Sequence, residues 1–215
     1  MGVKPHWKTW KSVVIAALFG VIATPAVQAT ELETNNAEVL ERVTSSLNAM
    51  DNIAGDFVQV GPDGTRVEGK FYMDRPGKLR FEYNPPSALQ IVADGFWVAI
   101  QDKNLKTTEK YPLAATPLKL ILARNVNLNR DARVVDVFAQ PDFVTVTVEA
   151  RSEETPGSLA LMFDGDTYEL RQWTVTDAQG LDTSIALSNL RNDQELEARL
   201  FRIIEDRILE IDGNR

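Results

Sequence analysis

Hydrophobic and polar residues alternate with a period of two along most of the chain from Gly55 onwards. Successive side chains of an extended strand point to opposite faces, so this alternation predicts short β-strands that each have an apolar face. Turn sequences rich in Gly, Pro and Asp follow several of these stretches, which favours antiparallel neighbours. The predicted strands cover residues 55–60, 68–74, 78–83, 89–95, 96–101, 143–150, 159–165, 169–177 and 184–190.

Two segments have the spacing of helices. In residues 36–50 the apolar positions recur at i, i+1, i+4 and i+8 from Val39, which gives one apolar stripe. Residues 116–124 open with Thr116 and Pro117, which suit the N-cap and the first position of a helix. The apolar side of this second, short helix consists of Leu118, Ile121 and Leu122.

The strands and helices belong together in one domain, because no Pro-, Gly- or Ser-rich linker divides the chain after residue 30 and no repeat is present. The regular spacing of strands and turns predicts a mainly β (α+β) fold, with one antiparallel sheet that is curved or closed into a barrel. The tail from Arg202 fits a last strand, a helix or an irregular end.

The first 29 residues have the pattern of a cleaved secretory signal peptide. A short segment with three lysines and no acid precedes the apolar run Val13–Ala23, and the small-residue pattern before the predicted cleavage site ends at Ala29. The alternative is a membrane anchor, but a membrane-spanning helix needs about 20 apolar residues and this run has 11. Residues 1–29 are therefore predicted to be removed on export, leaving residues 30–215 as the mature domain.

Charge and residue usage narrow the function. The whole chain has 23 basic and 31 acidic residues, and removal of three lysines with the signal peptide leaves 20 against 31, a net charge of −11. Such a protein is a poor binder of nucleic acids and anionic membranes. There is no cysteine, which excludes disulfides, cysteine-bound metal and lipid attachment at an N-terminal cysteine.

Catalytic motifs are missing. The sequence has neither a phosphate-binding Gly-x-x-x-x-Gly-Lys-Ser/Thr loop nor a Gly-x-Ser-x-Gly elbow, and its only histidine, His6, lies in the predicted signal peptide. A pair of carboxylates could still hydrolyse glycosides, but Asp63, Asp94 and Asp164 each precede a glycine and are explained by turns. We therefore predict no enzyme activity, no cofactor and no metal site.

The apolar faces of the strands leave two interpretations open, an ordinary β core and a cavity for an apolar ligand. One residue does not fit a simple core. Arg75 shares its face with Phe71 and Met73, at the end of an apolar stripe. From its position alone, its stem could pack on these neighbours while the guanidinium reaches water.

A series of short motifs runs from Asp56 to about Val126. It consists of Phe57 and Gln59, Gly69 and Phe71, Arg75-Pro76, Arg80-Phe81-x-Tyr83 with Pro85-Pro86, Asp94-Gly95 with Trp97, Leu105-Lys106-x-Thr108, and Thr116-Pro117-Leu118. In these residues the chain resembles the periplasmic outer-membrane lipoprotein carrier family (LolA). The C-terminus departs from that family, because the Phe-x-Phe-x-Pro ending is missing.

The resemblance implies an incomplete, strongly curved antiparallel β-barrel with helices as a lid over its concave apolar face. It also implies a monomeric periplasmic chaperone that carries acylated lipoproteins from an inner-membrane ABC transporter to the outer membrane or a receptor there. Alternatives of the same fold are a lipid- or lipoprotein-sensing envelope-stress module and a carrier of another lipid.

The same resemblance assigns roles to residues. Arg75 is expected to be a latch that hydrogen-bonds carbonyl groups of the lid, a task that suits the five donors of a guanidinium. The lid helix would contribute Leu118, Ile121 and Leu122. The apolar face that binds the cargo would consist of Phe57, Phe71, Met73, Leu79, Phe81, Tyr83, Ile91 and Trp97.

Overall fold

A single antiparallel sheet of 11 strands forms the body of the protein. The computed structural model describes residues 26–151 and 157–204, and side chains from Asn36 onwards. The strands follow the order β6-β5-β4-β3-β2-β1-β11-β10-β9-β8-β7. Their bounds are β1 Asn52–Val60, β2 Arg66–Asp74, β3 Lys78–Tyr83, β4 Leu89–Asp94, β5 Trp97–Asp102, β6 Thr107–Pro112, β7 Ala132–Ala139, β8 Phe143–Ala150, β9 Ser158–Asp164, β10 Leu170–Thr176 and β11 Asp182–Arg191.

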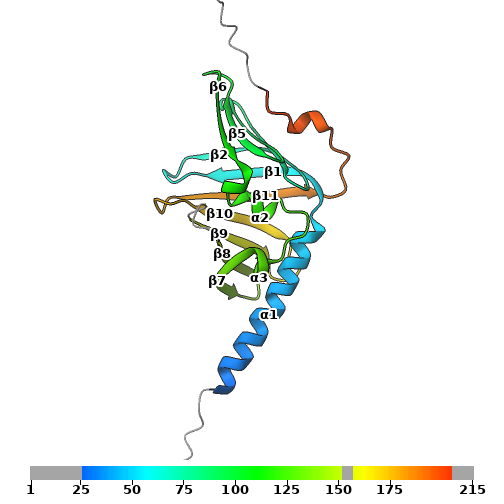
Figure 1. Cartoon of the computed structure of the whole chain (residues 1–215), viewed down its shortest axis with the longest axis vertical. Coiled ribbons are helices and arrows are strands. Elements are labelled where there is room, and N and C mark those ends of the chain that lie inside the picture. Colours follow the sequence, from blue (N-terminus) through cyan, green and yellow to red (C-terminus); the bar gives the residue numbers. More distant parts are fainter. Residues whose placement is uncertain (1–25, 152–156, 205–215) are drawn as a thin grey trace, which may run out of the picture.

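The sheet is open, with β6 and β7 at its two edges, and it curves so that its halves face each other (Figure 1). The two halves meet where β1 pairs with β11, for example Phe57 opposite Leu187. All other neighbours in the sheet are sequential hairpin partners. The predicted incomplete, curved antiparallel barrel is therefore confirmed, and it is not closed.

Helices are few. The long helix α1, Ala26–Ala49, runs along one side of the sheet, and the single-turn helices α2, Leu118–Ile121, and α3, Leu128–Asp131, lie between β6 and β7 in the sequence (Figure 1). Two 3₁₀ turns, η1 Leu113–Ala115 and η2 Ala198–Phe201, complete the described elements. No helix among the described residues is long and apolar enough to cross a membrane.

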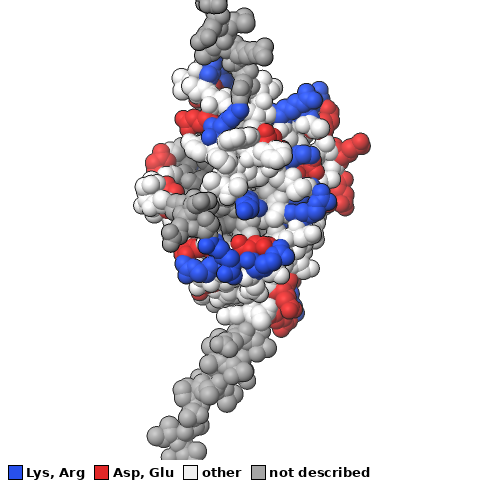
Figure 2. Space-filling view, viewed as in Figure 1, with Lys and Arg blue, Asp and Glu red and all other residues white. Residues whose placement is uncertain are grey.

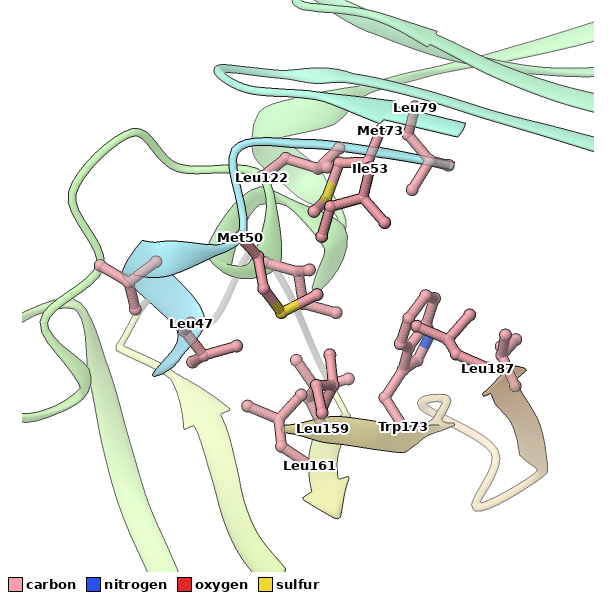
Figure 3. Close-up of a cluster of buried hydrophobic side chains, with 14 of the residues drawn as sticks. Leu47, Met50, Ile53, Met73, Leu79, Leu122, Leu159, Leu161, Trp173 and Leu187 are labelled. Carbon is pink, nitrogen blue, oxygen red and sulfur yellow. The ribbon is translucent and has the colours of Figure 1, made fainter. Parts of the chain in front are cut away.

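The core lies inside the concavity. Alternate residues of the strands from both halves point inward and pack together with the buried side of α1 and with residues of α2. Figure 3 shows how these side chains converge from the two sides of the curved sheet. Among those that it labels are Leu47, Met50, Ile53, Met73, Leu79, Leu122, Leu159, Leu161, Trp173 and Leu187.

Each of the nine predicted strands has a counterpart, whereas β6 and β7 were not predicted. The predicted helix 36–50 is the C-terminal part of α1. The predicted helix 116–124 is shorter than expected, and Thr116 does not cap it, because its hydroxyl donates backwards to the carbonyl of Leu113 at 2.9 Å. Of the predicted signal peptide, residues 1–25 lie outside the described residues.

The loop between β2 and β3 brings Arg75 to the lid. It contains three residues, since Asp74 pairs with Lys78, and the peptide bond between Arg75 and Pro76 is cis. Gly77 has a φ of 79°, a conformation that favours glycine. A Cβ at this position would also lie only 2.7 Å from the Cα of Gly95, so this loop packs tightly against the β4–β5 turn.

Candidate cargo site and lid

Four of the residues predicted to bind cargo form the centre of the concave wall. Phe71 lies opposite Phe81, and Met73 lies opposite Leu79, in the β2–β3 pair. Residues that face each other across an antiparallel pair share one side of the sheet. All four side chains are buried in the core cluster, so the wall that the sequence predicted is present and is covered in this structure.

Aromatic rings extend this wall. The ring centroids of Phe57 and Phe81 lie 4.7 Å apart, and those of Phe57 and Tyr83 lie 5.1 Å apart, both in edge-to-face geometry. The phenol of Tyr83 donates a hydrogen bond of 2.7 Å to Oε1 of Gln59. Burial raises the pKa of Tyr83 to about 12.

Two further predicted residues are less buried than these. Ile91 lies on the concave side opposite Phe81 and is half-buried. Trp97 was predicted on the same face, and this prediction is wrong: its side chain is 44% exposed on the outer face. The β4–β5 register pairs Ala93 with Val98, so odd-numbered residues before the turn share a face with even-numbered residues after it.

The other half of the sheet supplies an equal share of the site, which the sequence did not single out. Trp173 is buried in the concavity, and its ring centroid lies 6.0 Å from that of Phe71 across the core. Its Nε1 has no hydrogen-bond partner among the described residues. The available signal was the alternation of β9 and β10, whose inward residues include Leu159, Leu161 and Phe163.

The lid consists of α1 and α2. One side of α1 is buried through Val39, Val43, Leu47 and Met50, which follow a helical spacing of three or four residues. Of the predicted lid residues, Ile121 and Leu122 are buried in the same core, whereas Leu118 packs against it and is half-buried. Apolar side chains of the lid therefore cover the concave wall in this structure (Figure 3).

Arg75 is one of the few buried polar residues in the described chain, with only 6% of its surface exposed. Its Nη1 donates to the carbonyl of Leu47, near the end of α1, at 2.5 Å. Nε and Nη2 have no partner among the described residues. Burial lowers the pKa of Arg75 to about 10, while the negative charge of Asp51 raises it, so the guanidinium stays charged at neutral pH.

Backbone contacts place the same loop between the two lid elements. The amide of Arg75 donates to the carbonyl of Asp51, just after α1, at 3.2 Å. The amide of Gly77 donates to the carbonyl of Leu122 at 2.9 Å. The β2–β3 loop therefore holds α1 with the Arg75 side chain and α2 with its own backbone.

A second connection joins the lid elements directly. Nδ2 of Asn48 donates to the carbonyl of Val126 at 2.9 Å, and the amide of Val126 donates to Oδ1 of Asn48 at 2.8 Å. This paired arrangement uses both ends of the side-chain amide. It fixes α1 to the segment between α2 and α3.

The site offers apolar enclosure and little reactive chemistry. The described residues include no group of three or more His, Cys, Asp or Glu residues that could hold a metal ion. The polar groups that the described residues bring to the concavity include the guanidinium of Arg75, the phenol of Tyr83 with the Gln59 amide that it contacts, and the indole of Trp173. Such a surface suits a ligand that is bound by burial of apolar area, which imposes no strict geometry.

Residues 48–204 match the family model described as outer membrane lipoprotein carrier protein LolA. The chain belongs to the LolA family. An outer-membrane lipoprotein carrier protein of Chromobacterium violaceum is 27% identical over 191 residues, covering 86% of this chain and 92% of that protein. Another from Methylococcus capsulatus is 30% identical over 171 residues, covering 75% and 81% respectively.

A solved structure with a similar chain path is that of a LolA superfamily protein from Nitrosomonas europaea. Its TM-score is 0.46 at 9% sequence identity, and the match covers 78% of this chain and 97% of that one. The resemblance to LolA stated from the motifs between Asp56 and Val126 is confirmed by the family match, which also covers the C-terminal half of the sheet. The family model and these relatives are named as carrier proteins.

Proposed function

We propose that this protein is a periplasmic chaperone that shelters the acyl chains of lipoproteins. It would accept them from an ABC transporter of the inner membrane and release them to the outer membrane or to a receptor there. The observation that carries this proposal is the large apolar concave wall, covered by a lid that few polar contacts hold in place.

The physical need for such a carrier is clear. Burial of a methylene stabilises by about 0.8 kcal/mol. For three acyl chains with about 15 methylenes per chain, the total free-energy cost of exposure to water is on the order of 35 kcal/mol. The concave wall is covered by side chains of α1 and α2 in the described state. Acyl chains would therefore displace the lid and pack against the apolar side chains of the wall.

Weak retention of the lid fits a carrier that must load and unload. Arg75 would act as a latch, because one guanidinium contacts α1 while its neighbour Gly77 contacts α2. Apolar contact has no strict directionality, so cargo can be held without a fixed pose and released to a site of higher affinity. The energy for loading would come from the transporter.

The test is to express the full chain together with a triacylated lipoprotein, purify it from the periplasmic fraction and record native mass spectra. We expect a one-to-one complex that contains all three acyl chains. The same lipoprotein with its acylated cysteine replaced by serine is the control, and it should not bind. A well-folded carrier that never yields a stoichiometric complex would contradict the proposal.

A further inference from the structure

A second hollow borders the core beside α2. It is a pocket of about 530 Å³, a size typical of small-molecule sites. Its walls come from η1 and α2 on one side and from α3, β8 and β9 on the other. Figure 2 shows lysine and arginine side chains gathered over the part of the surface where α3 lies in Figure 1.

The floor of this pocket is apolar. Leu120 and Ala123 line it from the α2 side, and Val148 and Leu159 line it from the sheet. Leu120 and Ala123 are only half-buried, so apolar area remains uncovered there. The pocket adjoins the cargo site, because Val148 and Leu159 also belong to the core cluster in which Ile121 and Leu122 are buried.

The rim of the pocket is basic. Lys119, Arg124, Arg130 and Arg151 line it, together with the acids Asp131 and Glu149. Both acids are already paired. Asp131 accepts hydrogen bonds of 2.6 and 2.9 Å from Arg130, and Glu149 forms an ion pair with Arg133.

Among the described residues, Arg130 is the only rim cation in an ion pair, and the charge of Lys119 also interacts with that of Asp131. Within the described residues, none of Lys119, Arg124 and Arg151 forms an ion pair. The guanidinium of Arg151 donates to the carbonyls of Asn129 at 2.6 Å and Arg130 at 3.0 Å. These two hydrogen bonds fix the orientation of the guanidinium, but the neutral carbonyl groups do not cancel its charge. Such a concentration of positive charge is unexpected on a chain of net charge −8.

We propose that this pocket binds an anionic amphiphile, whose phosphate or carboxylate group meets the rim cations and whose single short tail covers the apolar floor. Guanidinium groups match the geometry of both anions. A free inorganic anion would leave the floor uncovered, and a nucleobase would find no aromatic side chain among the lining residues. The pocket differs from the cargo site in its basic rim, although it shares α2 and Leu159 with that site.

The experiment uses dodecyl phosphate below its micellar concentration, added to the mature protein in a calorimeter and in amide chemical-shift titrations. Dodecyl maltoside supplies an uncharged headgroup of the same chain length, and inorganic phosphate supplies the anion alone. We expect dodecyl phosphate to bind about tenfold or more tightly than either of them. The largest amide shifts should map to residues 118–124, 128–131 and 148–151.

Charge reversal at the rim is the decisive variant. Arg124→Glu should weaken dodecyl phosphate binding by about tenfold or more, because it adds repulsion where attraction was lost. Arg66→Glu makes the same change of charge on the exposed β1–β2 hairpin and should leave the affinity within about twofold. Ala123→Trp should fill the floor and abolish binding.

Three outcomes would overturn the proposal. Equal losses in Arg124→Glu and Arg66→Glu would mean a general charge effect. Equal affinities for inorganic phosphate and dodecyl phosphate would mean that the apolar floor binds nothing. Shifts confined to the indole of Trp173 and its neighbours would place the amphiphile in the cargo site instead.

Discussion

A buried arginine that is only partly hydrogen-bonded contacts the lid, and we expect it to influence how firmly the lid is held. Arg75 contributes one bond, to the carbonyl of Leu47, while two of its donor atoms have no partner among the described residues. A hydrogen bond to a charged group stabilises a fold by about 1.5–3 kcal/mol, but an incompletely paired buried charge costs a comparable amount. The residue therefore has more influence on lid position than on overall stability.

We predict that Arg75→Leu folds, retains lipoprotein and is impaired in onward transfer. The free energy of unfolding should change by less than about 2 kcal/mol, because the lost bond and the removed buried charge offset each other. Transfer from the loaded variant to acceptor membranes should fall by about tenfold, because the lid no longer returns to its closed position against the leucine. Urea unfolding and a fractionation assay of radiolabelled lipoprotein measure the two quantities.

Two controls sharpen that experiment. Arg75→Lys keeps the charge with fewer donors and should transfer at an intermediate rate. Arg66→Leu removes an exposed cation far from the lid and should behave as wild type. Transfer at the normal rate by Arg75→Leu would show that the side chain merely packs at the rim.

Tyr83 makes the stability of the concave wall dependent on pH. The folded-state pKa of about 12 exceeds the ordinary value of 10.0 because the phenol is buried. The unfolded chain therefore releases this proton first, and the stabilisation is full below pH 10 and is lost as pH rises toward 12. Relative to Tyr83→Phe, wild type should lose roughly 2 kcal/mol between pH 9 and 11.5.

Urea unfolding of the two proteins at matched pH measures that difference, because the titration of all other groups is common to both. At pH 7 we expect wild type to be the more stable of the two proteins. Tyr83→Phe should be less stable by about 1 kcal/mol, because Oε1 of Gln59 loses its donor. Parallel pH profiles would mean that the phenol is accessible to water.

At the scale of elements, the lid depends on contacts between segments that are far apart in the sequence. Asn48 of α1 and Val126 bond to each other through both ends of the side-chain amide, at a separation of 78 residues. No periodicity connects these two positions, so the sequence does not predict the pair. This contact, together with the bonds of Arg75 and Gly77, makes α1 and α2 behave as one lid.

We predict that Asn48→Ala loosens the lid without unfolding the sheet. The amide of Val126 should exchange its hydrogen at least about tenfold faster, because it loses its acceptor, and the free energy of unfolding should fall by about 1 kcal/mol. Amides in the centre of β1 and β11 should keep their protection. Asn104→Ala, in the exposed β5–β6 turn, is the matched control, and equal exchange of Val126 in both variants would disprove the link.

What the sequence could predict also divides by element. Alternation identified nine strands, because their inward residues are strongly apolar and their turns contain Gly or Asp. It missed β6, whose residues Thr107–Pro112 are all exposed at a sheet edge and show no apolar face. It missed β7 as well, where the register shifts between Val134 and Asp136 and interrupts the alternation.

Only part of the candidate site could be predicted, because that prediction also depended on the alternation of apolar residues. The wall from Phe57 to Tyr83 followed from motifs and alternation, and Arg75 stood out because a cation occupied an apolar stripe. The placement of Trp97 failed because the hairpin register, which periodicity does not fix, assigns it to the outer face. The path of the C-terminal tail could not be predicted either. Backbone carbonyls of η2 and of the residues after it accept hydrogen bonds from Arg80 and Gln101 on the outer face, and no pattern in the sequence reveals such contacts.

At the scale of the whole molecule, the two halves of the sheet form one continuous core. The β1–β11 pair joins them along the backbone, and rings such as Phe71 and Trp173 meet across the concavity. Acyl chains that enter this space must therefore contact both halves at once. The two tryptophans outside the predicted signal peptide lie on opposite faces, since Trp173 is buried inside and Trp97 is exposed outside.

This arrangement gives a direct test of where cargo lies. Bromine atoms quench tryptophan fluorescence on contact, so a triacylated peptide with brominated acyl chains should quench the single-tryptophan variant Trp97→Phe, in which only Trp173 reports. We expect loss of at least about half of its emission, because acyl chains replace lid side chains around the indole. The variant Trp173→Phe, in which Trp97 reports, should keep its emission. Equal quenching of both variants would mean that the acyl chains bind the outer surface or an unfolded chain, and quenching of Trp97 alone would place them on the convex face.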